Sequence, residues 1–573
     1  MVQFMLTNQS VKKLSAVWSL VFFFALAPTS AVLAQDALST NQDSALYRGE
    51  ESMLAGSYAA ASEIFSQADG PDRIDGLIGA SRALVMMGNY LEAEEIVAEA
   101  IEDGAYADFP LLTTQLAEIK RMTGQSRAAL EILQRAIEGN AEPPVRSLVQ
   151  YGSLLKFTGR QGQWQQVLDR VVQRYNAGLV FSSEDVAMVA LASWLMGNLH
   201  DANSLFDEAT RANPDNLEAH TLWADLFLEK YNAADAERSY RDALDVNARY
   251  VPALVGIAQV VGDERSLQRA LAINPNSVRA LETYAQLLMI NGREQEAEEY
   301  FDKVLELNPE SLKTLSVLAA SAALEERMDE FAGYQQRVEA FSPGNAEFLG
   351  HIADSFGNNY RFEEAVHYAR ASIEADPEYW QGHTLLGSNL IRLGEEEEGR
   401  QSLEIGFDND PFNVMTSNML KVFDTLETYA TVESEHFKVH MSERDSLILW
   451  PYLEPLLEEG WDTLTAKYGF EPEGKILIEV FENSADFAVR SVGLPDIGPL
   501  VGICFGKVIT LISPDTLTAN WQEIVWHEFM HVITLQMTQN RMPRWLSEGI
   551  SVWEEREGRP YWGRRQGLDL VRA

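Results

Sequence analysis

Residues 275–308 read PNSVRALETYAQLLMINGREQEAEEYFDKVLELN, and the spacing of this stretch recurs through much of the chain. Prolines return every 34 residues, and all but one of them follow Asn or Asp: Pro275, Pro309, Pro343, Pro377 and Pro411. A small residue stands ten positions after the proline, and another stands twelve positions later. These residues are Ala224, Ala285, Ala319, Ala353 and Gly387, then Ala236, Ala297, Ala365 and Gly399, with Phe331 as the exception. Small side chains at such points let two paired helices approach closely.

The period and this pattern are those of the tetratricopeptide repeat, in which each unit is a pair of helices. Pro214 begins the same register, and weaker copies precede it. We expect residues 45–411 to form roughly ten helix pairs in a right-handed solenoid. The unit from Ala248 to Asn274 is seven residues short, and we expect it to lack most of the turn between its helices. The concave face of such an array binds a protein or peptide partner; the alternative is a purely structural spacer.

A second motif lies near the C-terminal end, where the chain reads WHEFMH from Trp526 and, further on, PRWLSEG. On a helix, His527 and His531 project from one face, as two ligands of one zinc ion must. Glu528 stands beside them, where its carboxylate can take a proton from a water at the metal. Glu548 can supply an anionic third ligand and leave a fourth position open, as in catalytic zinc sites. The alternative is a buried helix with two hydrogen-bonded histidines and a surface glutamate.

HEFMH followed by PRWLSEG resembles the gluzincin metallopeptidases, and most closely the peptidase MA-like domains attached to tetratricopeptide arrays in bacterial proteins. The resemblance covers about residues 430–562 for the peptidase, and much of the repeat array. It implies a zinc metallopeptidase with Glu528 as general base and three Zn²⁺ ligands: His527, His531 and Glu548. In gluzincins the strand that borders the cleft pairs with the extended substrate, and residues 502–513 are our candidate for that strand.

Two features depart from the gluzincin pattern. Some gluzincins carry an acidic residue four positions after the third ligand, which supports a zinc histidine. That position is Val552 here, although Ser551, Glu554 and Glu555 lie close to it in sequence, and Ser551 is our candidate for this support. Many gluzincins also have a C-terminal helical subdomain whose Tyr or His stabilises the oxyanion. Only 25 residues follow Glu548, and Tyr561 is the one side chain of that kind among them.

This short C-terminal end predicts either a truncated product or a site that a partner completes. The alternative to an enzyme is a non-catalytic exported scaffold with a retired or incomplete peptidase domain. In either case the expected fold is mainly α: an α-solenoid of tetratricopeptide helix pairs followed by an α+β gluzincin-like metallopeptidase domain. The expected boundaries are 1–34 for a signal peptide, 35–411 for the solenoid, 412–433 for a capping helix and linker, and 434–573 for the peptidase domain.

Local patterns place the elements of the last domain. We expect strands at 436–441, 475–482 and 508–512, and helices at 447–468 and 545–557. His436 and His440 lie about 13 Å apart along their strand, too far to share a metal ion. We expect these two histidines at the surface or at the sheet edge.

Residues 1–34 have the features of a secretory signal peptide. Lys12 and Lys13 form a basic start, an apolar run follows, and the segment ends in Val-Leu-Ala before Gln35. We expect cleavage there, with export to the periplasm or the medium of a bacterium; the alternative is an uncleaved membrane anchor. No cysteine follows the apolar run, so we expect no lipid anchor and no stable membrane attachment after cleavage.

The composition limits the partners. The chain has 573 residues, 46% of them hydrophobic and 23% charged, which is typical of folded proteins with more than one core. Its formal net charge of −41 repels nucleic acid and anionic lipid head groups, so we expect neither as a partner. Cys504 is the single cysteine, so no intrachain disulfide forms, and its apolar surroundings predict a buried, unreactive thiol.

Overall fold

The computed structural model describes residues 44–102, 109–160, 162–496, 498–516 and 520–558. The predicted signal peptide and Tyr561 lie outside these ranges. Helices α2 to α23 follow one another as eleven helix–turn–helix pairs, close to the roughly ten expected. Their bounds are α2 Ala45–Leu54, α3 Tyr58–Phe65, α4 Arg73–Met87, α5 Tyr90–Glu102, α6 Pro110–Met122, α7 Ser126–Glu138, α8 Val145–Phe157, α9 Gln163–Asn176, α10 Ser183–Leu195, α11 Leu199–Ala212, α12 Leu217–Glu229, α13 Ala233–Val246, α14 Val251–Val261, α15 Glu264–Ile273, α16 Val278–Ile290, α17 Glu294–Leu307, α18 Leu312–Leu324, α19 Met328–Phe341, α20 Ala346–Asn358, α21 Phe362–Ala375, α22 Trp380–Arg392 and α23 Glu396–Asn409.

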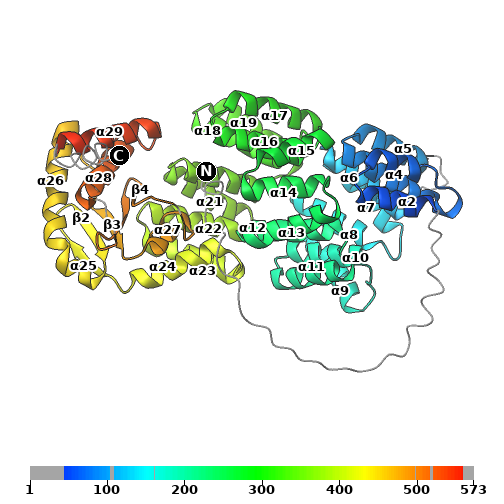
Figure 1. Ribbon diagram of the computed structural model, residues 1–573, viewed down its shortest axis with the longest axis horizontal. Helices are drawn as coiled ribbons and strands as arrows, with labels where there is room; N and C mark the ends of the chain where they lie inside the picture. The colour runs from blue at the N-terminus through cyan, green and yellow to red at the C-terminus, as the bar shows by residue number, and fades with distance from the viewer. Residues whose placement is uncertain (1–43, 103–108, 161, 497, 517–519, 559–573) are drawn as a thin grey trace, which may run out of the picture. The chain divides into compact units, whose positions relative to one another are not determined.

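The chain divides into two compact units. Of the described residues, one unit holds those from 44 to 314 together with 337–343, and the other holds 315–336 together with those from 344 to 558. The small residues predicted between paired helices are buried in both units. Ala224, Ala236, Ala285, Ala297, Ala353 and Ala365 are each at most 1% exposed. The prediction of closely packed tetratricopeptide-like helix pairs is therefore confirmed (Figure 1).

In the first unit, loops of early repeats lie against turns of much later ones. Asn247 Nδ2 donates a hydrogen bond to the carbonyl oxygen of Met53 at 2.9 Å, across 194 residues of sequence. One repeat further along, Asn274 Nδ2 donates to the carbonyl oxygen of Val85 at 3.1 Å, across 189 residues. These two Asn residues therefore have two roles, because each lies in the turn between helix pairs and also binds the C-terminal end of a helix in a distant repeat.

The short repeat corrects one expectation. Helices α14 and α15 have 11 and 10 residues, whereas α16 and α17 of the next repeat have 13 and 14. The loop between α14 and α15 still spans two residues, against three in the next repeat. Six of the seven missing residues are thus lost from the helices, and the prediction that most of the turn had disappeared is wrong.

The second unit contains a five-stranded mixed sheet in the order β1-β2-β3-β5-β4. Strands β2, β3 and β5 are parallel, and β1 and β4 pair antiparallel at the two edges. The helices of this part of the chain precede, connect or follow the strands. The bounds are α24 Val414–Leu426, β1 Ala430–Glu433, β2 Phe437–Met441, α25 Glu443–Ile448, α26 Trp450–Tyr468, β3 Ile476–Phe481, α27 Ser484–Val492, β4 Gly502–Cys504, β5 Val508–Ile512, α28 Trp521–Met537 and α29 Arg544–Gly558.

Apolar side chains from both sides bury this sheet. On one side, α26 and α28 pack against strand residues that include Phe437 and Ile478. On the other, α24 and α27 pack against a second set that includes Phe481 and Ile512. Cys504 belongs to the first core, and burial raises the pKa of its thiol well above its ordinary value, as expected of an unreactive cysteine.

Two expectations for this region need correction. The segment predicted as capping helix and linker contains α24 but also β1, so the sheet begins at Ala430 and not after residue 433. We expect His436 and His440 at the surface or an edge, yet His440 lies on the inner strand β2 and His436 directly precedes it, and their side chains are only 26% and 14% exposed. The ring of His436 stacks on Trp461 with centroids 4.0 Å apart, and this aromatic contact covers part of it.

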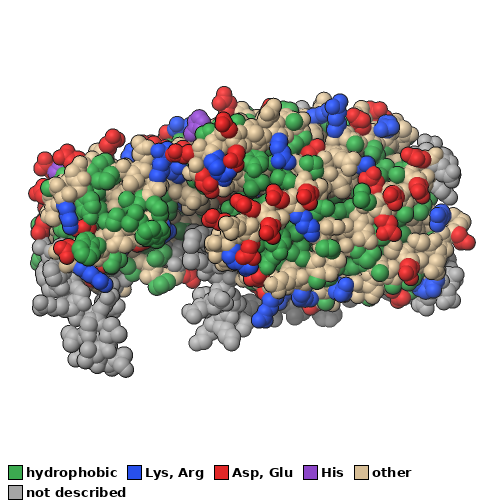
Figure 2. Space-filling model, turned by 90° about the horizontal axis from the view of Figure 1, so that it is seen from above, with side chains coloured by type: hydrophobic (Ala, Val, Ile, Leu, Met, Phe, Trp, Pro, Cys, Tyr) green, Lys and Arg blue, Asp and Glu red, His purple; other side chains and the backbone are tan. Residues whose placement is uncertain are grey.

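On the face shown in Figure 2, the acidic charge is distributed. Asp and Glu side chains are spread across the visible face and do not gather in one patch (Figure 2). This distribution is what a solvated surface requires. Within the described ranges, no helix has the length and apolar character needed to cross a membrane.

Candidate metal centre

Helix α28 carries both histidines of the predicted site. Its residues Val525, Phe529, Val532 and Ile533 are at most 4% exposed and pack in the sheet core. This packing fixes the rotation of the helix, so the remaining face carries the histidines. After α28 the chain turns through Gln539 and Asn540, both with positive φ, and α29 returns beside it.

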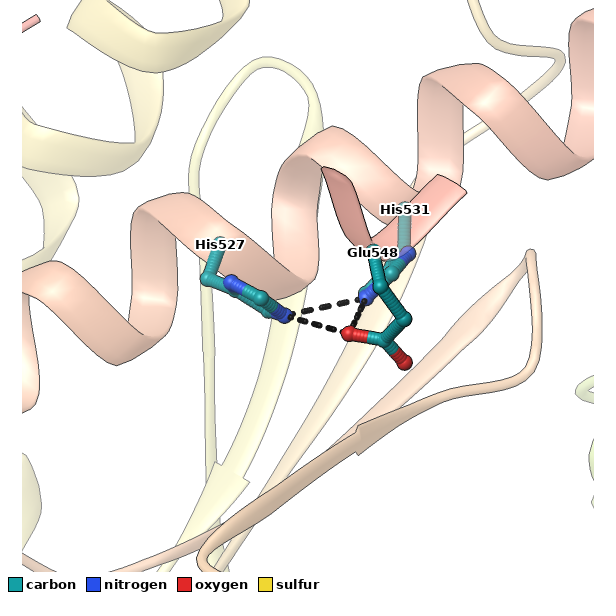
Figure 3. Close-up of side chains that lie close together, drawn as sticks. All are labelled: His527, His531 and Glu548. Carbon is teal, nitrogen blue, oxygen red and sulfur yellow. Dashed lines mark hydrogen bonds and ion pairs between the residues drawn. The ribbon is translucent and has the colours of Figure 1, made fainter. Parts of the chain in front are cut away.

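Three side chains from these two helices point toward one another (Figure 3). The Nε2 atoms of His527 and His531 lie 3.0 Å apart. Oε2 of Glu548 lies 3.3 Å from the first nitrogen and 3.4 Å from the second. Two ligands of a tetrahedral zinc ion, each 2.0–2.1 Å from the metal, lie about 3.3 Å from each other. Among the described residues, this is the one group of three or more His, Cys, Asp or Glu side chains close enough to hold a metal ion together.

Each histidine also forms a hydrogen bond through Nδ1, the ring nitrogen that does not belong to the ligand triangle. Nδ1 of His531 lies 2.8 Å from Oγ of Ser547, and that hydroxyl lies 2.7 Å from Oγ1 of Thr534. The predicted support, Ser551, is also at this histidine but further away, at 3.4 Å. Nδ1 of His527 bonds directly to the carboxylate of Glu555. Such partners fix the orientation of a metal-binding imidazole.

The sequence predicts no role for Ser547, and it places Glu555 only near the position of the expected acidic support. Glu548, Ser551 and Glu555 are spaced three and four residues apart, so on a helix they share one face. That spacing is the signal that could have identified Glu555. The neighbouring Glu554 has a different role, because its carboxylate binds Lys467 and Tyr468 on α26.

Glu528 lies at the junction of α28 and the edge strand β4. Its side chain is buried, and burial raises the pKa of its carboxyl although His531 and His527 lower it. A Cβ atom added at Gly502 would lie only 2.8 Å from Oε1 of Glu528. Glycine at this point of β4 therefore leaves the space that the carboxylate occupies. Within the described part of the chain β4 is the last strand of the sheet, so its outer edge has no neighbouring strand.

The charges predict how zinc affinity depends on pH. Burial lowers the pKa of His527, but hydrogen bonds to Glu548 and Glu555 outweigh it and raise the pKa to about 10. The metal-free site is therefore protonated at His527 near neutral pH, and a metal ion must displace that proton. We expect apparent zinc affinity to rise about tenfold per pH unit from pH 7 to 9, measured by competition with a chelator of known affinity. Affinity that stays constant over this range would contradict the protonated state.

Comparisons with known proteins identify the helical part. Two family models, each described as the tetratricopeptide repeat, match residues 190–259 and 278–311. The chain carries tetratricopeptide repeats. Among solved structures, the crystal structure of yeast Tom70 is similar at 16% identity, with 66% of this chain and 88% of that chain covered and a TM-score of 0.29. No curated protein matches the chain. The metal centre is therefore inferred from the geometry of His527, His531 and Glu548.

Proposed function

We propose that this protein is an exported zinc-dependent metallopeptidase whose repeat array recruits protein substrates or partners. Tetratricopeptide repeats bind proteins, so the array is a protein-interaction scaffold. The peptidase proposal rests chiefly on one observation. Three ligand atoms, from His527, His531 and Glu548, form a triangle of the size that one zinc ion requires, with Glu528 on the same helix.

The chain's own residues have distinct roles in this proposal. The two histidines and Glu548 hold the ion, while Glu555 and Ser547 orient the imidazoles. A zinc ion bound there supplies Lewis acidity, which activates water and polarises the scissile carbonyl group. The carboxylate of Glu528 accepts a proton from the attacking water and then delivers it to the nitrogen of the leaving amine. Burial supports this role, because it raises the pKa of the Glu528 carboxyl and so makes the carboxylate a stronger base toward the water proton.

The free edge of β4 supplies a place for an extended peptide. A peptide added beside this strand would bond to main-chain groups and would need no particular sequence. Gly502 in this strand lies directly against Glu528, so a backbone paired there would pass beside the general base. This arrangement favours peptide bonds over other hydrolysable groups as the substrate.

Zinc content tests the proposal directly. We expect about one zinc ion per purified full chain, and we expect Glu548→Ala to weaken zinc binding by at least about 10²-fold because the anionic ligand is lost. Glu557→Ala removes an exposed carboxylate from the same helix and is the matched control, which should retain its zinc. A wild-type chain that takes up no zinc after dialysis against the metal would refute the metallopeptidase.

The second candidate is a non-catalytic exported scaffold, and the match of the repeats to protein-binding families favours it. In that case the repeats bind a partner and the sheet region only supports them. The two proposals differ in one readout. A wild-type chain that binds zinc but leaves a labelled unfolded protein uncut would favour the scaffold.

We also propose that the chain acts outside the cytoplasm, on the basis of the signal-peptide features of residues 1–34. When the gene is expressed in a bacterium, we expect the protein in the periplasmic or extracellular fraction with Gln35 as its first residue. Intact-mass measurement of the purified protein reads out this processing. Protein recovered from the cytoplasm with residues 1–34 still attached would contradict the proposal.

A further inference from the structure

Three loops of the repeat array, two of them in consecutive repeats, have a non-glycine residue with positive φ at a position where the other repeats have glycine; the earliest is Tyr231. Residues 292, 326, 360 and 394 are spaced 34 apart, in the loop between the two helices of successive repeats. All four have positive φ, and two of them are glycines, Gly292 and Gly394. The other two are Glu326 and Tyr360, with φ of 62° and 63°. A non-glycine residue in this conformation costs about 1 kcal/mol or more, and such strain is often found where the side chain has a function.

Both side chains reach the segment that carries the third metal ligand. Oε1 of Glu326 lies 3.1 Å from Nε of Arg541, in the turn before α29. The ring of Tyr360 lies 5.7 Å from the guanidinium carbon of Arg544, the first residue of α29. Glu326, Tyr360 and α29 belong to the same compact unit. Two consecutive repeat loops thus contact the start of the helix that presents Glu548.

Arg544 in turn contacts Glu548, the third ligand of the metal centre. Nε of Arg544 lies 3.4 Å from Oε1 of Glu548, while Oε2 of that carboxylate faces the two histidines. One oxygen is therefore engaged by a cation and the other is directed at the ligand triangle. The ring of Tyr360 is itself held, because it packs 5.4 Å from Phe362 and 6.2 Å from Phe505, the residue after β4.

We infer that the repeat array positions the third ligand of the metal centre, through Tyr360 acting on Arg544 and Arg544 acting on Glu548. Tyr360 and Arg544 are positioning residues, since neither lies within the ligand triangle. The inference rests on the proposed zinc site and adds that the array is part of the support of that site. Metal affinity then depends on a loop that lies almost 190 residues before the ligand in sequence.

The test is a set of zinc affinities measured on the full chain by chelator competition. Tyr360→Gly installs the residue that two neighbouring repeats already have, so the loop keeps its backbone while the ring is lost. We expect this variant and Arg544→Met each to weaken zinc binding by about tenfold. Loss of a residue that supports a metal ligand typically weakens binding by about 10- to 100-fold, and the smaller value is expected here because Arg544 is largely exposed. We expect the double variant to be no weaker than either single one, because the two residues act in series.

Two matched variants separate positioning from general damage. Tyr360→Phe keeps the ring and should bind zinc as tightly as the wild type. Tyr231→Gly makes the same change at the equivalent left-handed position of another repeat, and it should also leave zinc affinity unchanged. The visible absorption of the cobalt-substituted chain reports ligand geometry, and we expect it to change with Tyr360→Gly but not with Tyr231→Gly.

Each outcome leads to a distinct conclusion. If the wild type binds zinc while Tyr360→Gly and Arg544→Met bind it equally well, the inference is wrong and the proposed peptidase stands. Equal weakening by Tyr231→Gly would also overturn it, because the effect would then come from the repeats in general. If the wild type binds no zinc, both the inference and the proposed function fail.

Discussion

Glu528→Gln is expected to lower peptide hydrolysis by about 10³-fold while the protein still binds about one zinc ion per chain. Glutamine has the shape of glutamate but cannot accept the proton of the attacking water. The ligand atoms belong to other residues, so the metal should remain in place. Hydrolysis of fluorescently labelled casein, measured beside zinc content, separates loss of the base from loss of the metal.

The control for this variant is Glu557→Gln, which makes the same chemical change at an exposed position of α29. It should retain full activity and full zinc content. Activity retained by Glu528→Gln would remove Glu528 from the role of general base. Loss of zinc from Glu528→Gln would show instead that the buried carboxylate supports the metal site, since its pKa already reflects both histidines.

The fold of the repeats could be predicted because each unit has small residues at the same positions, where its two helices pack closely. Small residues such as Ala285 and Ala297 mark where two helices must approach, and their spacing is visible in a single sequence. The hydrogen bonds from Asn247 and Asn274 to helix ends 194 and 189 residues earlier could not be predicted. They depend on how far the array rotates with each repeat, and no local pattern encodes that angle.

The ligands of the candidate site were predictable for a similar reason. His527 and His531 are four residues apart on one helix, and Glu548 follows at the start of the next. The supporting residues depend on packing between helices and are harder to identify. Glu555 shares a helix face with Glu548, so its spacing was informative. Tyr360 comes from a distant repeat, and only its place at a glycine position of the repeat distinguishes it.

Breaking a buried ion pair beside the sheet is expected to cause a large loss of stability. Arg490 on α27 and Glu479 on β3 have side chains that are 1% and 0% exposed, and Nε of the arginine lies 2.7 Å from Oε2 of the carboxylate. The arginine also donates to the carbonyl oxygen of Ile391 in α22 at 3.3 Å. We expect Arg490→Met to destabilise the sheet by about 3–5 kcal/mol, because Glu479 is left buried without its partner. Hydrogen exchange of the β3 amides measures this free energy locally.

The stability lost in Arg490→Met should depend on pH, because Glu479 titrates. Burial raises the pKa of Glu479 to about 7, although Arg490 opposes the shift. A carboxyl with a raised pKa in the folded state stabilises the fold below its ordinary value of 4.5, and this contribution is lost as the pH rises through about 7. Arg490→Met should therefore lower the free energy of unfolding less at pH 5 than at pH 8. At pH 8 an exposed carboxyl is ionised, so folding must either bury the charge of Glu479 without its partner or protonate Glu479, and both cost free energy.

Two further variants show whether the buried charge is responsible. Adding Glu479→Leu to Arg490→Met should restore most of the lost stability, because an apolar pair can replace a buried ion pair of similar volume. Arg444→Met breaks an exposed pair with Asp515, whose side chains are 62% and 55% exposed, and should change stability by less than about 1 kcal/mol. If the double variant is as unstable as Arg490→Met alone, the loss comes from the packing of α27 against the sheet and α22. The charge on Glu479 would then have no part in it.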